Sequence, residues 1–257
     1  MTEHVRAKVD QGVLTLTLAR PEKKNALTTA MYKKLTAELT RAEEDPAVRV
    51  VLIESEGDTF TAGNDIMDFA AFATGQAPAS EMGGHVFLAA LARAQKPYVA
   101  AVQGKAVGIG TTMLLHCDLV FVAEDAVLTT PFVNLALVPE AASSMLLPAR
   151  VGHARAFAMF ALGEPVDSRK AVEIGLANAA VPASEVRARA LTAARALAER
   201  PIGALIATKR LMRDADLIAR VMEKEGEHFR VRLKSPEAAE AFRAFAERRA
   251  PDFSKVA

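Results

Sequence analysis

Tryptophan is absent from this 257-residue chain, aromatic residues make up only 5% of it, and Cys117 is the single cysteine. One cysteine excludes an internal disulfide framework and a cysteine-based metal cluster. We expect a core built mainly from alanine, valine, leucine and isoleucine. A chain without disulfides also fits a reducing, cytoplasmic setting, which is the predicted location.

An excess of charge of either sign is also lacking, because the formal net charge is only +1. This balance argues against a nucleic-acid partner and against an anionic membrane surface. The first residues carry charges from Glu3 onward and show no apolar stretch, so a secretory signal is not expected there.

One long stretch is nearly free of charge. Among the 24 residues from 126 to 149, Glu140 is the only acidic or basic one. Pro131, Pro139 and Pro148 interrupt this stretch, which makes a membrane-spanning helix improbable. The pattern instead predicts buried loops and short elements in a soluble protein, with no membrane partner.

The first 150 residues alternate between strand and helix patterns. Period-two alternation predicts strands on either side of Gln11-Gly12, and a nearly all-apolar strand is predicted over 48–55, as when both sheet faces are covered. Thr28 is a candidate cap for the next helix. Further predictions are a surface excursion over 70–84, a helix over 84–94, strands over 98–102 and 118–123, and a short helix over 111–116.

From about residue 151 onward every segment has a helical pattern. Strands and helices followed by helices alone indicate the α/β class. We expect an α/β core over residues 1–200 and a helical part over 201–257.

Two glycine-containing loops follow apolar strands. The first is "FTAGND" (60–65), and the second is "GKAVGIG" (104–110), which precedes a short helix. Free backbone amides at a helix start stabilise an anion or a developing oxyanion. Glycines also simply make turns, and their spacing here matches neither a dinucleotide-binding nor a P-loop pattern.

Four segments together resemble the crotonase, or enoyl-CoA hydratase/isomerase, superfamily: "RPEKKNAL", "FTAGNDI", "KPYVAAVQGKAVGIGTTMLLHCDLVFVAEDA" and "GLANAAVP". They occur in the family's order along nearly the whole chain. The resemblance implies a spiral of ββα units with two roughly perpendicular sheets. It also implies that residues 201–257 support a homotrimer, or a hexamer made of two trimers.

The resemblance further implies an acyl-CoA thioester substrate and no separate cofactor, since coenzyme A is part of the substrate. Two backbone amides would hold the thioester oxygen as an enolate forms, and here they are those of Asn64 and Ile109. The positions that would contact the substrate are Lys24, Ala26, Ala62, Gly63, Asp65, Ile66, Gly108, Phe132 and Leu137. For Lys24, an ordinary solvated surface lysine is an equally good interpretation.

The hydratases of the family use two glutamates, and this chain has neither. One would stand three residues after the second amide donor, where the chain has Thr112, and the other where it has Phe132. The segment "TPFVNLALVPEAASSMLLP" instead resembles the peroxisomal-type Δ3,Δ2-enoyl-CoA isomerases, in which a single glutamate is the base. The matching residue is Glu140, with Phe132, Leu135 or Leu137 as a candidate apolar wall.

Glu140 also has a purely structural interpretation. Pro139-Glu140 before a run of small residues suits the start of a helix, where an acid interacts with the helix dipole. Three functions therefore stay open: an isomerase, a hydratase-like lyase with rearranged groups, and a CoA-binding scaffold without catalysis. No cluster of His, Asp or Glu has metal-ligand spacing, so no metal site is expected.

Overall fold

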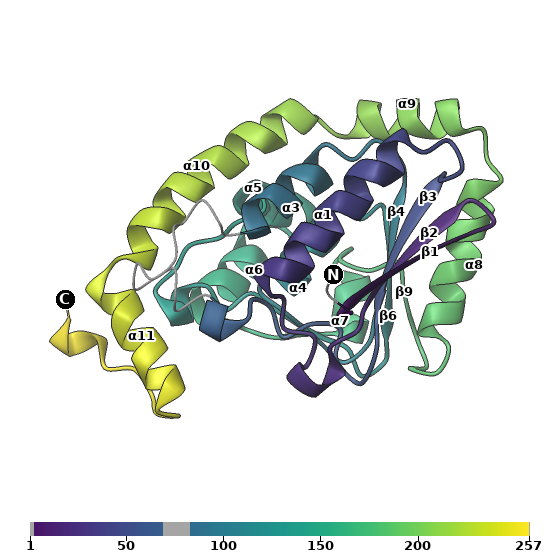
Figure 1. Cartoon of the computed structure of the whole chain (residues 1–257). Helices are drawn as coiled ribbons and strands as arrows, with labels where there is room; N and C mark the ends of the chain where they lie inside the picture. Colours follow the sequence, from purple (N-terminus) through teal and green to yellow (C-terminus); the bar gives the residue numbers. More distant parts are fainter. Residues whose placement is uncertain (1–2, 69–82, 257) are drawn as a thin grey trace.

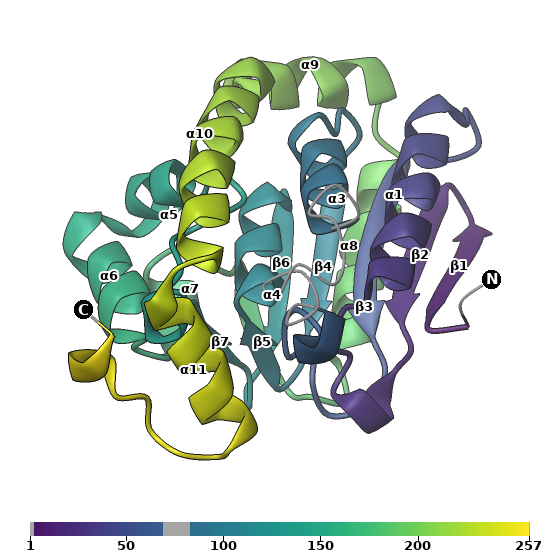
Figure 2. The same cartoon turned by 60° about the vertical axis from the view of Figure 1, so that its left-hand side comes forward.

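Two β-sheets organise the computed structural model, which describes residues 3–68 and 83–256 (Figures 1 and 2). The larger sheet has the strand order β1-β2-β3-β4-β6-β9, and the smaller one β5-β7-β8. In the larger sheet only β1 and β2 are antiparallel. Its strands are β1 (Val5–Asp10), β2 (Val13–Leu18), β3 (Val50–Ser55), β4 (Tyr98–Val102), β6 (Leu119–Ala123) and β9 (Ala179–Val181).

The first two strands form the predicted hairpin. Its register pairs Asp10 with Val13 across the two-residue turn. Gln11 and Gly12 both have positive φ, 48° and 77°, as a tight turn between twisted strands requires. The predicted position of this turn is confirmed.

Strand β3 is apolar along its length because helices cover both of its faces. Val51 and Ile53 belong to the main core, while Val50 and Leu52 pack in a second cluster beneath α8 (Val186–Ala198). Figure 1 shows α8 on one side of the sheet and α1 and α3 on the other. The continuous apolar pattern thus has the predicted cause.

Helix α1 (Thr29–Glu44) begins where the sequence predicts. The Thr28 hydroxyl accepts a hydrogen bond from the Met31 amide at 3.3 Å, and the Asp68 carboxylate accepts one from the Thr29 amide at 2.8 Å. Two acceptors satisfy amides that a helix start otherwise leaves unpaired. Helix α3 (Gly83–Ala92) packs beside α1. Most of the surface excursion predicted over 70–84 lies outside the described residues.

The remaining elements are short until the C-terminal helices. The smaller sheet contains β5 (Lys105–Val107), β7 (Val127–Thr129) and β8 (Val166–Asp167). The helical segments are η1 (Pro21–Lys23), α4 (Ile109–Thr112), η3 (Met113–His116), η4 (Val133–Leu135), α5 (Ser143–Val151), α6 (His153–Phe157), the π-helical turn η5 (Ala158–Leu162), α7 (Ser168–Glu173), α9 (Ile202–Met212), α10 (Ala215–Leu233), α11 (Pro236–Ala246) and η6 (Phe253–Lys255).

Two predictions about this region are wrong. The chain beyond residue 151 is not wholly helical, because β8 pairs with β7, and β9 extends the larger sheet beyond β6. The glycine loop 103–110 also contains β5. These strands have two or three residues, too few for a period-two pattern, and their backbone pairing forms only once the neighbouring strand is in place.

The C-terminal helices pack back onto the core. Figures 1 and 2 show α9 and α10 crossing one end of the molecule, with α11 following below α10. Leu233 of α10 joins the main core, and Ile218 joins a small cluster with Ala92 and Ala142. The division near residue 200 and the trimer-forming role of residues 201–257 stay predictions. None of the helices within the described ranges is long and apolar enough to cross a membrane.

One close backbone approach gives a test of the fold. Gly104 has φ +57°, and an added Cβ would lie 1.8 Å from the Asp58 carbonyl oxygen. We expect Gly104→Ala to lower the free energy of unfolding by at least about 2 kcal/mol, because the clash is with backbone and cannot relax by rotation of a side chain. Urea unfolding at fixed protein concentration measures this change.

The matched control is Gly203→Ala in helix α9, where a Cβ meets no atom within 4 Å. This variant should be unchanged or stabilised by up to about 1 kcal/mol, since alanine favours helix over glycine. Equal unfolding midpoints for the two variants would contradict the close approach of residues 58 and 104.

Candidate active site

The two glycine loops lie side by side. The Thr61 amide donates to the Lys105 carbonyl at 3.1 Å, and the Val107 amide donates to the Thr61 carbonyl at 3.0 Å. These bonds make a parallel bridge between Thr61 and Ala106. Beyond the bridge, the first loop continues to Asn64 and the second to Ile109, so both predicted amide donors emerge at the same edge.

Gly63 is required by this approach of the loops. Its φ is +91°, and an added Cβ would stand 2.9 Å from the Val107 carbonyl oxygen. An L side chain would therefore be strained in conformation and would also push the two loops apart. Gly63 and Gly108 immediately precede the two predicted donors, and Gly108 also has positive φ.

Among the described residues, the amides of Asn64 and Ile109 are free of protein acceptors. Within the described ranges, neither donates a hydrogen bond to the protein. By contrast, the amide that follows Asn64 and the amide that precedes Ile109 each donate to a backbone carbonyl 2.9 Å away. An amide without a protein acceptor is available to a ligand.

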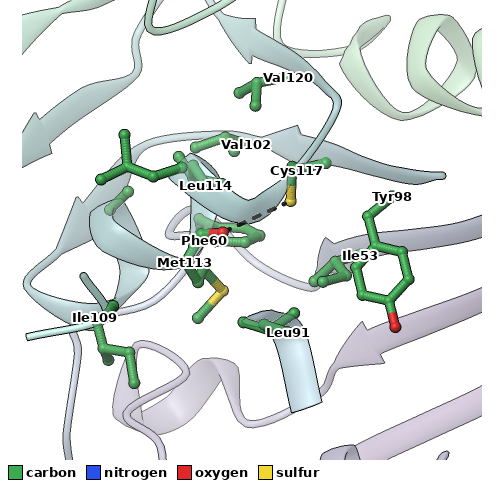
Figure 3. Close-up of a cluster of buried hydrophobic side chains, with 14 of the residues drawn as sticks. Ile53, Phe60, Leu91, Tyr98, Val102, Ile109, Met113, Leu114, Cys117 and Val120 are labelled. Carbon is green, nitrogen blue, oxygen red and sulfur yellow. Dashed lines mark hydrogen bonds between the residues drawn. The ribbon is translucent and has the colours of Figure 1, made fainter. Parts of the chain in front are cut away.

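The second donor is carried by a firmly packed segment. Figure 3 shows Ile109, Met113 and Leu114 along the α4–η3 segment with Phe60 beside them. The Ile109 side chain is 3% exposed. Its side chain therefore anchors the segment in the core while its amide remains at the start of α4.

The residues predicted to contact the rest of the substrate surround the first loop. The Ala62 amide donates to the Lys24 carbonyl at 2.9 Å, which joins the two segments. The Lys24 ammonium forms an exposed ion pair with Asp58 at 2.8 Å. An exposed pair contributes little stability, so the Lys24 side chain is free to exchange partners.

Asp65 has a structural partner. Arg20 donates to its carboxylate at 2.6 Å and to the Ala26 carbonyl at 3.0 Å. Although burial opposes ionisation, the hydrogen bond from Arg20 holds the pKa of Asp65 below its usual value. Arg20 thus links Ala26 and Asp65, two of the predicted contact positions, and Ile66 directly follows Asp65.

Glu140 lies beside Thr112. The Thr112 hydroxyl donates to the Glu140 carboxylate at 2.5 Å. Thr112, at the position where the resemblance predicts a hydratase glutamate, stands three residues after Ile109 on the same short helix. Thr112 lies about one helical turn from Ile109, so its contact brings Glu140 against the helix that begins with the second predicted donor.

The environment makes Glu140 a weaker acid. The side chain keeps some contact with solvent, yet burial raises its pKa from 4.5 to about 7. The hydrogen bond from Thr112 opposes this rise, and the negative charge of Glu225 adds to it. A carboxyl group of this kind exchanges protons readily near neutral pH.

The backbone after Glu140 is strained. Ala141 and Ala142 both lie in the left-handed region, with φ values of 65° and 55°. For a residue other than glycine, asparagine or aspartate, this conformation is costly unless the surroundings impose it. One such contact is a hydrogen bond of 2.8 Å from the His116 ring to the Ala141 carbonyl.

The state of His116 follows from its partners. Because a carbonyl only accepts, His116 Nε2 carries the proton, and Nδ1 accepts from Arg213. Burial and then the charge of Arg213 lower the pKa of His116 to about 3. The ring is therefore neutral, and its contacts are structural.

The helix-start interpretation of Glu140 is wrong. Helix α5 begins at Ser143, its N-cap is Ala142, and Glu140 does not cap it with its side chain. The acid that does so is Glu225 of α10, whose carboxylate accepts from the Ala142 and Ser144 amides at 2.6 and 2.8 Å. No local sequence pattern identifies Glu225, because it lies 81 residues from Ser144.

Tyr32 of α1 is a second residue that the sequence did not identify. Its hydroxyl donates to the Asn64 side-chain oxygen at 2.6 Å, and its ring packs 5.6 Å from that of Phe87. Burial and then the charge of Glu140 raise the pKa of Tyr32 well above its usual value. Tyr32 thus connects the first donor loop to the surroundings of Glu140. Its only sequence signal is its place next to Met31 on the apolar face of the helix.

Phe132 and Leu137 are both buried. The Phe132 ring lies 6.1 Å from that of Phe160, and the Leu137 amide donates to the Phe132 carbonyl at 2.9 Å. Both side chains belong to the main core. Among the residues that the structure describes, no group of three His, Cys, Asp or Glu side chains is arranged to hold a metal ion.

A family model described as "Enoyl-CoA hydratase/isomerase" matches residues 8–256. The chain is 32% identical to 1,2-epoxyphenylacetyl-CoA isomerase of Escherichia coli K12, over 99% of both chains. It is also 32% identical to enoyl-CoA delta isomerase 2 of Rattus norvegicus, over 93% of this chain and 62% of that one. A probable enoyl-CoA hydratase of Bacillus subtilis has the same identity over 95% and 96%.

Solved structures match along the whole length. A crystal structure of an enoyl-CoA hydratase/isomerase from Pseudoalteromonas atlantica superposes with a TM-score of 0.92 at 38% identity. The match covers 98% of this chain and 100% of that one. The two-sheet α/β architecture predicted from the sequence is therefore confirmed as the fold of these proteins.

The raised pKa of Glu140 predicts how stability depends on pH. The folded chain holds the Glu140 proton up to about pH 7, whereas the unfolded chain loses it near the ordinary value of 4.5. Stability from this group is thus present below about pH 4.5 and is lost as pH rises to about 7. We expect Glu140→Gln to be more stable than the parent by about 1–3 kcal/mol at pH 8, with no gain at pH 4.

Denaturant unfolding at both pH values measures this difference. Glu164→Gln, which changes an exposed glutamate, is the control and should show no pH-dependent gain. A Glu140→Gln variant that is less stable than the parent at pH 8 would show that the ionised carboxylate is favoured in the folded state.

Proposed function

The chain belongs to the enoyl-CoA hydratase/isomerase family, and we propose that within this family it moves the double bond of a 3-enoyl-CoA to the 2-trans position. One observation carries the proposal. Glu140 accepts a hydrogen bond from Thr112, which stands on the helix that begins at Ile109, while the two positions that the resemblance assigns to the hydratase glutamates hold Thr112 and Phe132. Neither of the two predicted hydratase positions therefore carries a carboxylate, and among the described residues Glu140 is the carboxylate that contacts the helix of the second predicted donor.

In the proposed reaction the amides of Asn64 and Ile109 bind the thioester oxygen. Removing a proton next to a thioester carbonyl places negative charge on that oxygen. Donors already aimed at the oxygen stabilise this charge by about 3 kcal/mol each, because they need no reorganisation during the reaction. Their lack of protein acceptors among the described residues supports this role.

Glu140 is the proposed base and acid. Its carboxylate takes a proton from C2 of the 3-enoyl-CoA, and the electrons left behind form a dienolate on the thioester. The protonated Glu140 then returns the proton to C4, which leaves the double bond between C2 and C3. No water or cofactor is consumed. A pKa of about 7 suits a group that must both accept and donate near neutral pH.

The coenzyme A part of the substrate is proposed to lie along the first loop. Lys24, Ala26, Ala62, Asp65 and Ile66 flank this loop, and Lys24 is the one exposed cation among them. Its ion pair with Asp58 is compatible with exchange toward a phosphate group of the substrate.

Self-association is proposed from the exposed apolar side chains of the C-terminal helices. Leu211, Met212 and Val231 are 90%, 83% and 71% exposed, and Phe245 of α11 is 55% exposed. These side chains are distributed along α9, α10 and α11, the helices to which the resemblance assigns trimer formation. A homotrimer, or a hexamer of two trimers, would bury them.

Two substrates separate the isomerase from the hydratase. With 3-enoyl-CoA the purified protein should produce the ultraviolet absorbance of a conjugated 2-trans-enoyl thioester. With 2-trans-enoyl-CoA in heavy-oxygen water it should incorporate no label, because a single carboxylate transfers only a proton. Label incorporation without isomerisation would establish a hydratase instead, and the absence of both reactions would favour a CoA-binding scaffold.

Glu140→Gln tests the proposed base. We expect isomerisation to fall by at least about 10²–10⁴-fold, since an amide cannot accept the proton, while the affinity for CoA changes little. Glu164→Gln should keep full activity. Activity retained in Glu140→Gln would mean that another group moves the proton.

A further inference from the structure

Helix α10 reaches the turn that carries Glu140. The carboxylate of Glu225 is bidentate, with one oxygen on the Ala142 amide at 2.6 Å and the other on the Ser144 amide at 2.8 Å. Glu225 is only 7% exposed. A buried carboxylate is costly unless it is hydrogen-bonded, so this contact accounts for its presence in the packed face of α10.

The packing around Glu225 fixes its position. Ile218 and Met222 stand on the same stripe of α10 as Glu225, at spacings of four and three residues. Ile218 packs in a cluster with Ala92 and Ala142, against which Met222 also lies. The apolar stripe thus packs α10 against the turn, and this packing places the Glu225 carboxylate next to the turn's amides.

The turn depends on such contacts. Ala142 has positive φ and no side chain able to cap α5. The Ser143 amide donates to the Glu140 carbonyl at 3.0 Å, but the Ala142 and Ser144 amides need an acceptor from outside the turn. Glu225 supplies this acceptor on one side, while His116 holds the Ala141 carbonyl on the other. Two alanines remain in an unfavourable conformation because both sides of the turn are held.

We propose that Glu225 is a positioning residue for Glu140: it fixes the strained turn 141–142 through the Ala142 and Ser144 amides and places a second carboxylate beside that turn. The catalytic part of this inference rests on the proposed function. Glu225 does not touch the reacting atoms in this scheme. It acts through the backbone and through its electric field.

The charges around Glu140 decide in which direction its pKa shifts when Glu225 is replaced. The Thr112 hydroxyl of α4 and the Tyr32 phenol of α1 are uncharged near neutral pH, and His116 of η3 is neutral beside the cation of Arg213. Burial is the main cause of the raised pKa of Glu140, and the like charge of Glu225 adds to it. Removing this charge should therefore lower the pKa of Glu140.

The first test needs no substrate. Carbon-13 NMR of protein labelled at the glutamate carboxyls reports each titration, and the signal lost in Glu140→Gln identifies Glu140. In Glu225→Gln we expect the titration midpoint of Glu140 to fall by roughly 0.5–1 pH unit. An unchanged midpoint would overturn the proposal.

The control is Glu240→Gln. Glu240 is also 7% exposed and lies in the C-terminal helices, but its partners are Arg249 and the Asp252 amide. This variant should leave the midpoint of Glu140 where it is in the parent. An equal shift in both variants would make the effect a general loosening of the C-terminal helices and would overturn the role of Glu225.

A double variant separates the backbone role from the charge. Glycine adopts positive φ without strain, so Ala142→Gly in the Glu225→Gln background should recover stability lost through the turn. The Glu140 midpoint should remain at its lowered value in this double variant. Return of the midpoint to the parent value would mean that backbone geometry alone sets it, against the proposed action of the charge.

Activity gives the last readout. On the isomerisation assay, Glu225→Gln should lower kcat about 10- to 100-fold while KM changes less than about threefold, because a displaced base misses its proton without losing the thioester contacts. The acid limb of the pH profile should move with the NMR midpoint. An unchanged kcat would overturn the positioning role. If the parent protein has no isomerase activity, only the proposed function is rejected, because the NMR test needs no substrate.

Discussion

The parallel bridge between Thr61 and Ala106 is the contact on which the rest of the site depends. It joins a loop that follows β3 to a strand that follows β4, and it places the amides of Asn64 and Ile109 at one edge. Such a short separation between backbones is possible because Gly63 has no Cβ to meet the Val107 carbonyl. A bulkier residue there would separate the donors by forcing the loops apart, even if every other contact were kept.

The second constraint is the strained turn after Glu140. A carboxylate near apolar surroundings and a like charge is destabilising, and two alanines with positive φ add to this cost. The structure offsets these terms with contacts from distant segments: His116 before β6, Arg213 after α9 and Glu225 on α10. A strained turn and a carboxyl group with a shifted pKa, both maintained by the surrounding fold, are typical of a site where a group must exchange protons.

Elements with long patterns were predicted well. The hairpin, the buried strand β3, helix α1 with its Thr28 cap and the long helices α8 to α11 all follow from periodicity and capping residues. The short strands β5, β8 and β9 were missed, because two or three residues carry no period and depend on a partner strand. The helix-start interpretation of Glu140 was wrong for a related reason: the acid that caps α5 comes from a helix far along the chain.

The sequence by itself determined the family and the α/β class, and it supplied a short set of candidate site positions, because glycine loops, a lone carboxylate in an apolar run and the residue types at Thr112 and Phe132 are local facts. Only the tertiary structure decided that Thr112 contacts Glu140, that Tyr32 holds the Asn64 side chain and that Glu225 holds the turn. Proton affinity and backbone strain depend on burial and on charges brought together from distant segments, and those exist only in the folded chain.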